Sequence, residues 1–395
     1  MNPAFVLDIP AVIRAIRTAT GTEDQRIALH EPCFVGNEWN YVKDCIDSGW
    51  VSSVGAYVDL FEQMIREYTG IEGVVAVVNG TAALHVCLLL SCVGLNDEVL
   101  VPSLSFVATA NAVSYCGAVP HFVDVDERTL GIDPRRLAVY LAEITELRDG
   151  VCFNRATGRA IKAVVPMHTF GHPVDLDTLA EVCLRFGLYM VEDSAESLGS
   201  FYKGRHTGFR GHCAALSFNG NKTVTTGGGG AILTTDRDLA DRARYITTTA
   251  KRPHRWEFFH DTVGYNYRMP NLNAALGCAQ LEQLPSFIGK KRALAERYQE
   301  AFQFVRGVRF FREPDFGVSN YWLNTIILDE EAEEYRETLL QMLNDGGLMA
   351  RPVWTPLHRL PMYDMCPQMD LSVTRKLERR LVNIPSSPFL EGEHV

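Results

Sequence analysis

Short apolar runs alternate with amphipathic stretches through the middle of the chain. Continuous apolar runs predict buried strands, and apolar residues that recur every three or four positions predict helices covering them. The predicted strands are 74–78, 98–102, 120–125, 161–167 and 188–191, and the predicted helices between them are 81–91, 106–115 and 176–186. Strands alternating with helices are typical of an α/β domain with a mainly parallel sheet.

Polar residues gather where these predicted strands end. Asn79, Ser103, His168 and Asp193 each stand at or just beyond the carboxyl end of a strand. Ligands of parallel sheets bind beyond this end of the strands. We therefore expect the binding site in the loops that contain these four residues.

The chain on either side of this α/β pattern is mainly helical. The further predicted helices are 11–18, 37–47, 58–68, 239–246, 271–284 and 293–304, and one further short strand is predicted at 325–328. At 395 residues, a chain of this length is expected to divide into more than one domain. We predict an N-terminal arm at 1–31, a large cofactor-binding domain at 32–284, and a smaller C-terminal α/β domain at 285–395.

The composition excludes several classes of protein. No apolar run approaches the ~20 residues of a membrane span, and the N-terminus lacks the pattern of a signal peptide, so we expect a cytoplasmic protein. The ten cysteines form no CxxC pair, which argues against a zinc site, and we expect no metal. A net charge of −10 disfavours nucleic-acid binding but allows an anionic small substrate held by a few arginines.

A lysine follows a further apolar strand, predicted at 214–218. The polar segment there reads Ser217-Phe218-Asn219-Gly220-Asn221-Lys222-Thr223. Its small hydroxyl and amide side chains could not bury the lysine's charge without other partners. Lys222 is therefore either an exposed lysine in a hairpin loop or a lysine with a chemical role.

Two other stretches favour the chemical role. The segment Asn79-Gly80-Thr81 joins a strand to a helix, and it is either a capped turn or an anion site made by the free amides of the first helical turn. Asp193 ends a buried strand and needs a cationic partner, either an arginine or a ligand. An anion site, a strand-end aspartate and a strand-end lysine together are what a pyridoxal phosphate site requires.

The glycine run Gly227-Gly228-Gly229-Gly230 has other interpretations. A phosphate loop needs a glycine directly before its lysine, whereas Asn221 precedes Lys222 here. A dinucleotide fingerprint leads into a helix, whereas this run leads into the apolar run 231–233. Tight backbone packing beside a cofactor is the remaining interpretation.

From about Gly36 to Pro388 the sequence resembles the DegT/StrS-type nucleotide-sugar aminotransferases, which are fold-type I pyridoxal phosphate enzymes. The matching motifs are Asn79-Gly80-Thr81-Ala82-Ala83-Leu84, the segment 102–111, Glu192-Asp193-Ser194-Ala195-Glu196, the segment 217–222 and Gly264-Tyr265-Asn266-Tyr267-Arg268-Met269. The resemblance implies a large, mainly parallel sheet domain, a smaller C-terminal α/β domain and a homodimer.

The resemblance also implies roles for single residues. Those expected to bind the phosphate are Gly80, Thr81, Ala82 and Ser217, together with Asn266 acting in the neighbouring subunit. Phe106 would stack on the cofactor ring, Asp193 would hold its nitrogen protonated, and Lys222 would bind the cofactor covalently and transfer protons. Glu196 replaces the Gln or His of many members, as it does in some perosamine-synthase-like and bacillosamine-type 4-aminotransferases, so the resemblance does not assign the contact that Glu196 makes.

The finer resemblance concerns the substrates. The runs 167–175 and 217–230 look most like the subgroup that aminates C4 of UDP-linked 2-acetamido-4-keto-6-deoxy sugars, with glutamate as the implied donor. A GDP-perosamine synthase-like enzyme is the alternative. The residues expected to bind substrate are His168, His254, Arg351 and His358, although the charged ones could equally form surface ion pairs.

Two other classes are less favoured. A sugar dehydratase of the same fold would have a histidine in place of Lys222. A non-catalytic regulator would carry an added DNA-binding domain, for which neither the length nor the charge leaves room.

Overall fold

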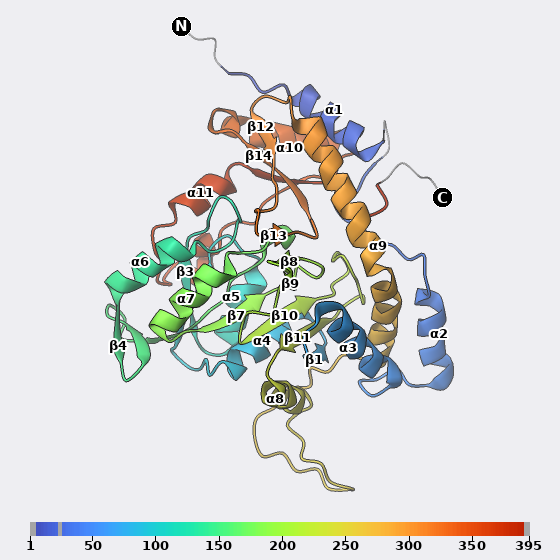
Figure 1. Ribbon diagram of the computed structural model, residues 1–395, viewed down its shortest axis with the longest axis vertical. Helices are drawn as coiled ribbons and strands as arrows, with labels where there is room; N and C mark the ends of the chain where they lie inside the picture. Colours follow the sequence, from blue (N-terminus) through green and yellow to red (C-terminus); the bar gives the residue numbers. More distant parts are fainter. Residues whose placement is uncertain (1–4, 23–25, 391–395) are drawn as a thin grey trace.

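The computed structural model describes residues 5–22 and 26–390 (Figure 1). Its centre is a sheet whose main strands run in the order β1-β11-β10-β7-β6-β2-β3. These strands are β1 (Gly73–Val77), β2 (Glu98–Pro102), β3 (Val119–Val123), β6 (Ala160–Val164), β7 (Tyr189–Asp193), β10 (Cys213–Ser217) and β11 (Gly230–Thr234). From β10 to β3 every neighbouring pair is parallel, whereas β11 is antiparallel to both of its neighbours. The predicted mainly parallel sheet is confirmed.

Helices cover this sheet and bury its apolar strands. The helices of this part are α2 (Glu38–Ser48), α3 (Ala56–Thr69), α4 (Gly80–Leu90), α5 (Val107–Tyr115), α6 (Pro134–Ile144), α7 (Leu176–Phe186) and α8 (Arg237–Thr247). A hairpin, β4 (Thr145–Arg148) and β5 (Val151–Asn154), extends the sheet beside β6. The hairpin and α6 were not predicted, although Asp133 and Pro134 are a typical cap and first residue for a helix.

A smaller sheet forms the upper part of the molecule in Figure 1. It consists of antiparallel strands in the order β12 (Val308–Phe310), β14 (Asn324–Leu328), β16 (Leu381–Ile384) and β15 (Arg351–Pro352). The helices of this part are α1 (Ile9–Thr20), α10 (Arg336–Asp345) and α11 (Ser372–Glu378). Apolar residues of α1, including Val12 and Ile16, share a buried cluster with this sheet. The N-terminal helix therefore packs with the C-terminal part of the chain.

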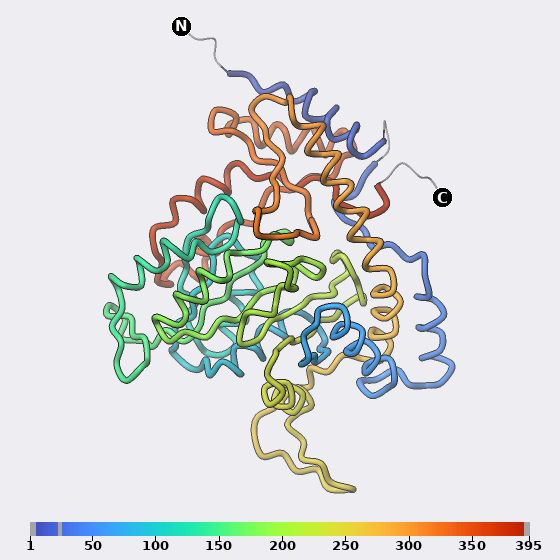
Figure 2. Tube along the Cα trace, in the orientation of Figure 1, coloured from blue at the N-terminus to red at the C-terminus, as the bar shows by residue number. Residues whose placement is uncertain are grey.

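One long helix, α9 (Asn271–Phe302), joins the two parts (Figure 2). The prediction of separate helices at 271–284 and 293–304 was wrong. Pro285 lies inside α9, where it removes one backbone hydrogen bond, but Leu284 and Phe287 on either side of it are buried. Packing of α1, α2 and α3 along α9 keeps the helix continuous. The predicted domain boundary at 284/285 consequently falls inside a helix.

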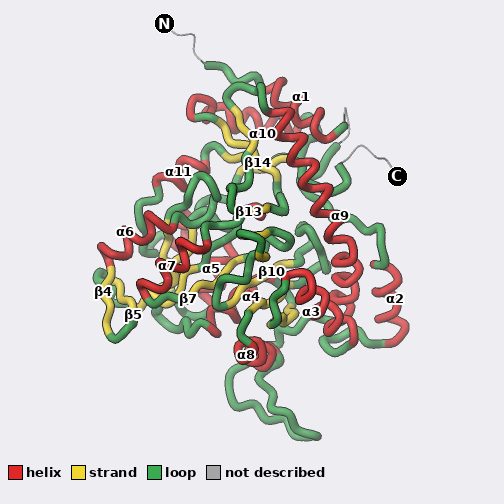
Figure 3. Tube along the Cα trace, in the orientation of Figure 1, coloured by secondary structure: helices red, strands yellow, loops and turns green. Residues whose placement is uncertain are grey.

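Three short strands lie between the two parts, in the order β13 (Gly317–Val318), β8 (Phe201–Tyr202) and β9 (Arg205–His206). The short 3-10 helices are Thr169–Gly171, Glu330–Tyr335, Leu357–Arg359 and Pro361–Tyr363. Between α8 and α9 the chain forms a long projecting loop (Figure 3). It is closed at its base by bridges from Lys251 to His260 and from Thr248 to Asn266.

Candidate active site

A pocket of about 360 Å³ opens at the carboxyl ends of the parallel strands, as the strand-end rule predicts. It is lined by Asn79, Gly80, Thr81, Leu84, Phe106, Ala108, Met167, Asp193, Ala195, Glu196, Ser217, Asn219, Asn221, Lys222, Gly229, Trp322 and Trp354. The fold thus brings together residues from three of the family motifs and from the segment that contains Phe106. Trp322 and Trp354 come from the C-terminal part of the chain, and the sequence motifs did not indicate them.

The start of α4 forms one wall of the pocket. Asn79 caps the helix, because its Oδ1 accepts a hydrogen bond of 2.8 Å from the amide of Ala82. The amide of Ala82 therefore already has a hydrogen-bond partner. Helix geometry leaves the amides of Gly80 and Thr81 without an intrahelical partner. The Ser217 hydroxyl lies close by, since a Cβ on Gly80 would come within 2.9 Å of the Ser217 Cβ. Two amides, a hydroxyl and the helix dipole make a suitable phosphate site.

The glycine run holds β11 against this wall. A Cβ on Gly230 would lie 2.5 Å from both the carbonyl carbon and the oxygen of Asn79. A Cβ on Gly229 would lie 2.2 Å from the Thr226 hydroxyl, and Gly229 itself lines the pocket. Only glycine permits this approach of two backbones, in agreement with the tight packing expected from the sequence.

Asp193 is buried at the end of β7 and lines the pocket. Its carboxylate accepts hydrogen bonds from the hydroxyl of Thr109 at 2.8 Å and from the amide of Ala195 at 3.2 Å. Among the described residues, no arginine or lysine forms an ion pair with it, and burial raises the pKa of the Asp193 carboxyl. A buried carboxylate that faces the pocket and forms no direct ion pair, although the charge of Lys222 acts on it from a distance, fits the protonated ring nitrogen of pyridoxal phosphate.

Lys222 and Glu196 meet on another side of the pocket. The Lys222 Nζ lies 3.2 Å from the Glu196 Oε1 and 3.7 Å from the centre of the Trp322 ring, and the lysine side chain is 13% exposed. The other oxygen of Glu196 accepts a hydrogen bond of 2.9 Å from the amide of Phe170. Burial raises the pKa of Glu196 to about 7, although the charge of Lys222 opposes this shift. The sequence did not assign a partner to Glu196, and in the structure its partner is Lys222.

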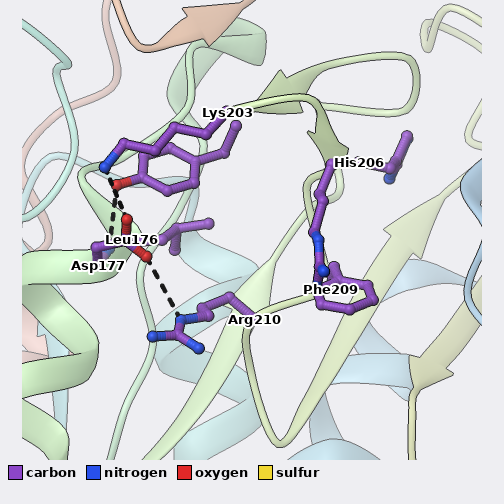
Figure 4. Close-up of a pocket in the computed structure, with 8 residues that line it drawn as sticks. Leu176, Asp177, Lys203, His206, Phe209 and Arg210 are labelled. Carbon is purple, nitrogen blue, oxygen red and sulfur yellow. Dashed lines mark hydrogen bonds and ion pairs between the residues drawn. The ribbon is translucent and has the colours of Figure 1, made fainter.

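A second lysine, Lys203, also follows Asp193 in the sequence, but it lies away from this pocket. It stands in the turn between β8 and β9, where its amine lies 2.7 Å from a carboxylate oxygen of Asp177, beside Arg210 (Figure 4). Lys203, Asp177 and Arg210 line a second pocket, and that pocket shares no lining residue with the one that contains Lys222. Of the two lysines, only Lys222 is placed to react with a molecule in the strand-end pocket.

Aromatic side chains border the pocket. Phe106, directly before α5, is 50% exposed, and its ring centre lies 6.3 Å from that of Trp354. Trp354 rests in turn on buried Phe170, with ring centres 5.1 Å apart. Phe106 is free to contact a planar ligand, as the resemblance implies.

The expected substrate residues do not line this pocket. His168 is fully buried, with its Nε2 2.9 Å from Glu192 and its Nδ1 accepting a hydrogen bond from the amide of Val174. Burial opposes ionisation of Glu192, but its hydrogen bonds from His168 and from backbone amides lower its pKa overall. These partners occupy both ring nitrogens, so His168 has a structural contact where a substrate contact was expected.

The other three candidates lie outside the pocket wall. His358 Nδ1 lies 2.7 Å from the Ser103 hydroxyl, and Arg351 is exposed at the start of β15. His254 is exposed on the projecting loop, and Asn266 is exposed at its base. Their roles in binding stay predictions. Asn266 does not line the pocket of its own chain, so its predicted phosphate contact would be made in a neighbouring subunit.

Comparison with known proteins matches residues 32–395 to the DegT/DnrJ/EryC1/StrS aminotransferase family. The chain belongs to this family. It is 37% identical over 369 residues to GDP-perosamine synthase of Escherichia coli O157:H7, which covers 93% of this chain and 95% of that protein. It is 36% identical over 340 residues to the putative pyridoxal phosphate-dependent aminotransferase EpsN of Bacillus subtilis, covering 86% and 84%. The crystal structure of the aminotransferase TlmJ from Streptoalloteichus hindustanus superposes with a TM-score of 0.81 at 31% identity, covering 91% and 93%.

These findings confirm the predicted fold class, the enzyme class and the cofactor. The protein is a pyridoxal phosphate-dependent sugar aminotransferase of the DegT/DnrJ/EryC1/StrS family. The described helices include none with the length and apolar character that crossing a bilayer requires.

Proposed function

We propose that this aminotransferase moves an amino group from glutamate to the C4 carbonyl of a nucleotide-linked 4-keto-6-deoxy sugar for surface polysaccharide or glycan synthesis. The observation that carries the proposal is the amine of Lys222 beside Glu196 in a pocket that also holds Asp193 and the start of α4. A cytoplasmic location stays a prediction from the composition.

Each residue of the pocket has a separate task. Gly80, Thr81 and Ser217 would hold the phosphate, and Asp193 would keep the ring nitrogen protonated. When bound, pyridoxal phosphate withdraws electrons from the α-carbon of the donor. Lys222 Nζ would take the α-proton as a general base and deliver it, as a general acid, to the cofactor carbon that carries the donor nitrogen. Glu196 Oε1 positions that amine through its 3.2 Å contact.

Two nucleotide-linked sugars are candidates for the amino acceptor. The E. coli relative named GDP-perosamine synthase supports a GDP-linked 4-keto-6-deoxymannose, and this is now the first candidate. The sequence resemblance placed a UDP-linked 2-acetamido-4-keto-6-deoxy sugar first. This second candidate is retained because a pair of amide side chains in the pocket suits an acetamido group.

The test is amination of both sugars with glutamate as donor. Product from either sugar, formed by the wild type and not by Lys222→Ala, supports the proposal. The two values of kcat/KM then identify the nucleotide and sugar. Absence of a 4-amino product from both sugars, in a protein whose bound-cofactor absorption is shifted by glutamate, would overturn the C4 assignment and leave the enzyme class standing.

A further inference from the structure

The turn before Lys222 holds two asparagine side chains in the pocket. The carbonyl oxygen of Asn219 accepts a hydrogen bond of 3.0 Å from the amide of Lys222. The carbonyl oxygen of Asn221 accepts one of 2.8 Å from the indole nitrogen of Trp322. Both backbones are therefore fixed, while both side chains are exposed and line the pocket. Side chains on a fixed turn are prepared for binding before a ligand arrives.

The two side chains also bond to each other. Asn219 Nδ2 donates a hydrogen bond of 3.1 Å to Asn221 Oδ1. Each amide side chain has one acceptor oxygen and one donor NH₂ group, so this bond leaves the Asn219 oxygen and the Asn221 NH₂ group for a ligand. Exchanging the O and N of both amides would still leave one acceptor and one donor.

A secondary amide complements this arrangement. An acetamido group has an N–H donor and a carbonyl acceptor separated by one carbon atom, so it can bond to groups on two different side chains. A hydroxyl group carries both functions on a single oxygen atom. Both asparagines line the same pocket as Lys222, whose amine serves C4, and C2 is two ring carbons from C4.

We propose that Asn219 and Asn221 form the subsite for an acetamido group at C2 of the sugar. The proposal rests on the proposed C4 aminotransfer, and it selects the second of the two candidate substrates. Asn219 oxygen accepts from the acetamido N–H, and the Asn221 NH₂ group donates to the acetamido carbonyl.

The experiment uses two UDP-linked 4-keto-6-deoxy sugars that differ only at C2, one with an acetamido group and one with a hydroxyl group. The wild-type holoenzyme should favour the acetamido sugar in kcat/KM by about 100-fold, since each neutral hydrogen bond contributes about tenfold. Asn219→Leu should reduce that preference about tenfold. Asn221→Asp keeps the shape of the side chain, removes the free donor, and should reduce the preference to a similar extent.

Gly220→Ala is the matched control. A Cβ at Gly220 meets nothing within 4 Å and its φ is not left-handed, so this variant should keep the wild-type preference. Equal kcat/KM values for the two sugars in the wild type, or an unchanged preference in both asparagine variants, would overturn the subsite while leaving C4 aminotransfer intact. Amination of neither sugar, nor of the GDP-linked one, would overturn the proposed function itself, and the subsite with it.

Discussion

The amine of Lys222 lies 3.2 Å from a carboxylate oxygen of Glu196, and both groups border the cofactor pocket. Glu196 is nearly inaccessible to water, and burial raises its pKa to about 7. The lysine that we predict to react with the cofactor therefore has as its neighbour an acid whose pKa lies near 7. Many members of the family have Gln or His at this position, and Gln does not titrate.

We predict a pH-dependent stability that originates in Glu196. Between the ordinary pKa of 4.5 and the folded value of about 7, the folded protein holds a proton that the unfolded chain has released. The free energy of unfolding should therefore fall as the pH rises through this window, by about 3 kcal/mol from this group. Urea unfolding of the cofactor-free protein at pH 5 and pH 7.5 measures the difference, and Glu196→Gln should lack this contribution.

A second variant separates this effect from other titrations. The charge of Lys222 lowers the pKa of Glu196, so Lys222→Met should move the stability transition to higher pH. Parallel pH profiles for the wild type and Glu196→Gln would contradict the assignment.

We predict that Lys222 binds the cofactor covalently. Borohydride reduction of the holoenzyme followed by peptide mapping should find the label on Lys222, because its amine lies in the pocket. Lys203 is the internal comparison, since it is exposed and paired with Asp177. Label on Lys203, or on any other lysine, would contradict the assignment of Lys222 as the cofactor-binding lysine.

The glycine run offers a test of the proposed phosphate site at the start of α4. Gly230→Ala would push a Cβ against the backbone of Asn79, which cannot rotate away, so the start of α4 has to shift. We expect the Kd for pyridoxal phosphate to rise about tenfold or more, which corresponds to a loss of about 1.4 kcal/mol. Equilibrium titration of the cofactor-free protein measures it.

Gly228→Ala is the control within the same run. A Cβ there meets nothing within 4 Å, so the affinity for pyridoxal phosphate should stay at the wild-type value. Equal losses in both variants would mean that the run acts through chain flexibility and not through close packing.

Local patterns predicted the large domain well, because its strands and helices follow directly from apolar periodicity. Strand β2 and helix α7 were predicted with the observed bounds. The continuity of α9 could not be predicted, since contacts with α1, α2 and α3 outweigh the local effect of Pro285.

The residues of the site also divide into those that local patterns predict and those that only tertiary packing brings together. Motif residues such as Asp193 and Lys222 were found because each follows a strand of the sheet. Trp322 and Trp354 were missed, because they reach the pocket from the C-terminal part through tertiary packing. His168 carried a misleading signal: a strand-end histidine was expected to meet substrate, but its ring is bonded to Glu192 inside the core.

The last prediction concerns a shared active site. Asn266 is exposed at the base of the projecting loop, and the stacked rings of Tyr265 and Tyr267, with centres 5.0 Å apart, flank it. It does not line the pocket of its own chain. If Asn266 completes the phosphate site of a second subunit, each site of a homodimer needs residues from both chains.

Mixing two inactive variants tests this arrangement. Lys222→Ala and Asn266→Ala homodimers should each be inactive or nearly so, because every site in them lacks one residue. In a mixed dimer, one site carries both substitutions and the other carries neither. After subunits exchange at random, about a quarter of the wild-type activity should return, since half of the dimers are mixed and each has one intact site. If differently tagged subunits co-purify as mixed dimers and no activity returns, Asn266 acts within its own chain or not at all.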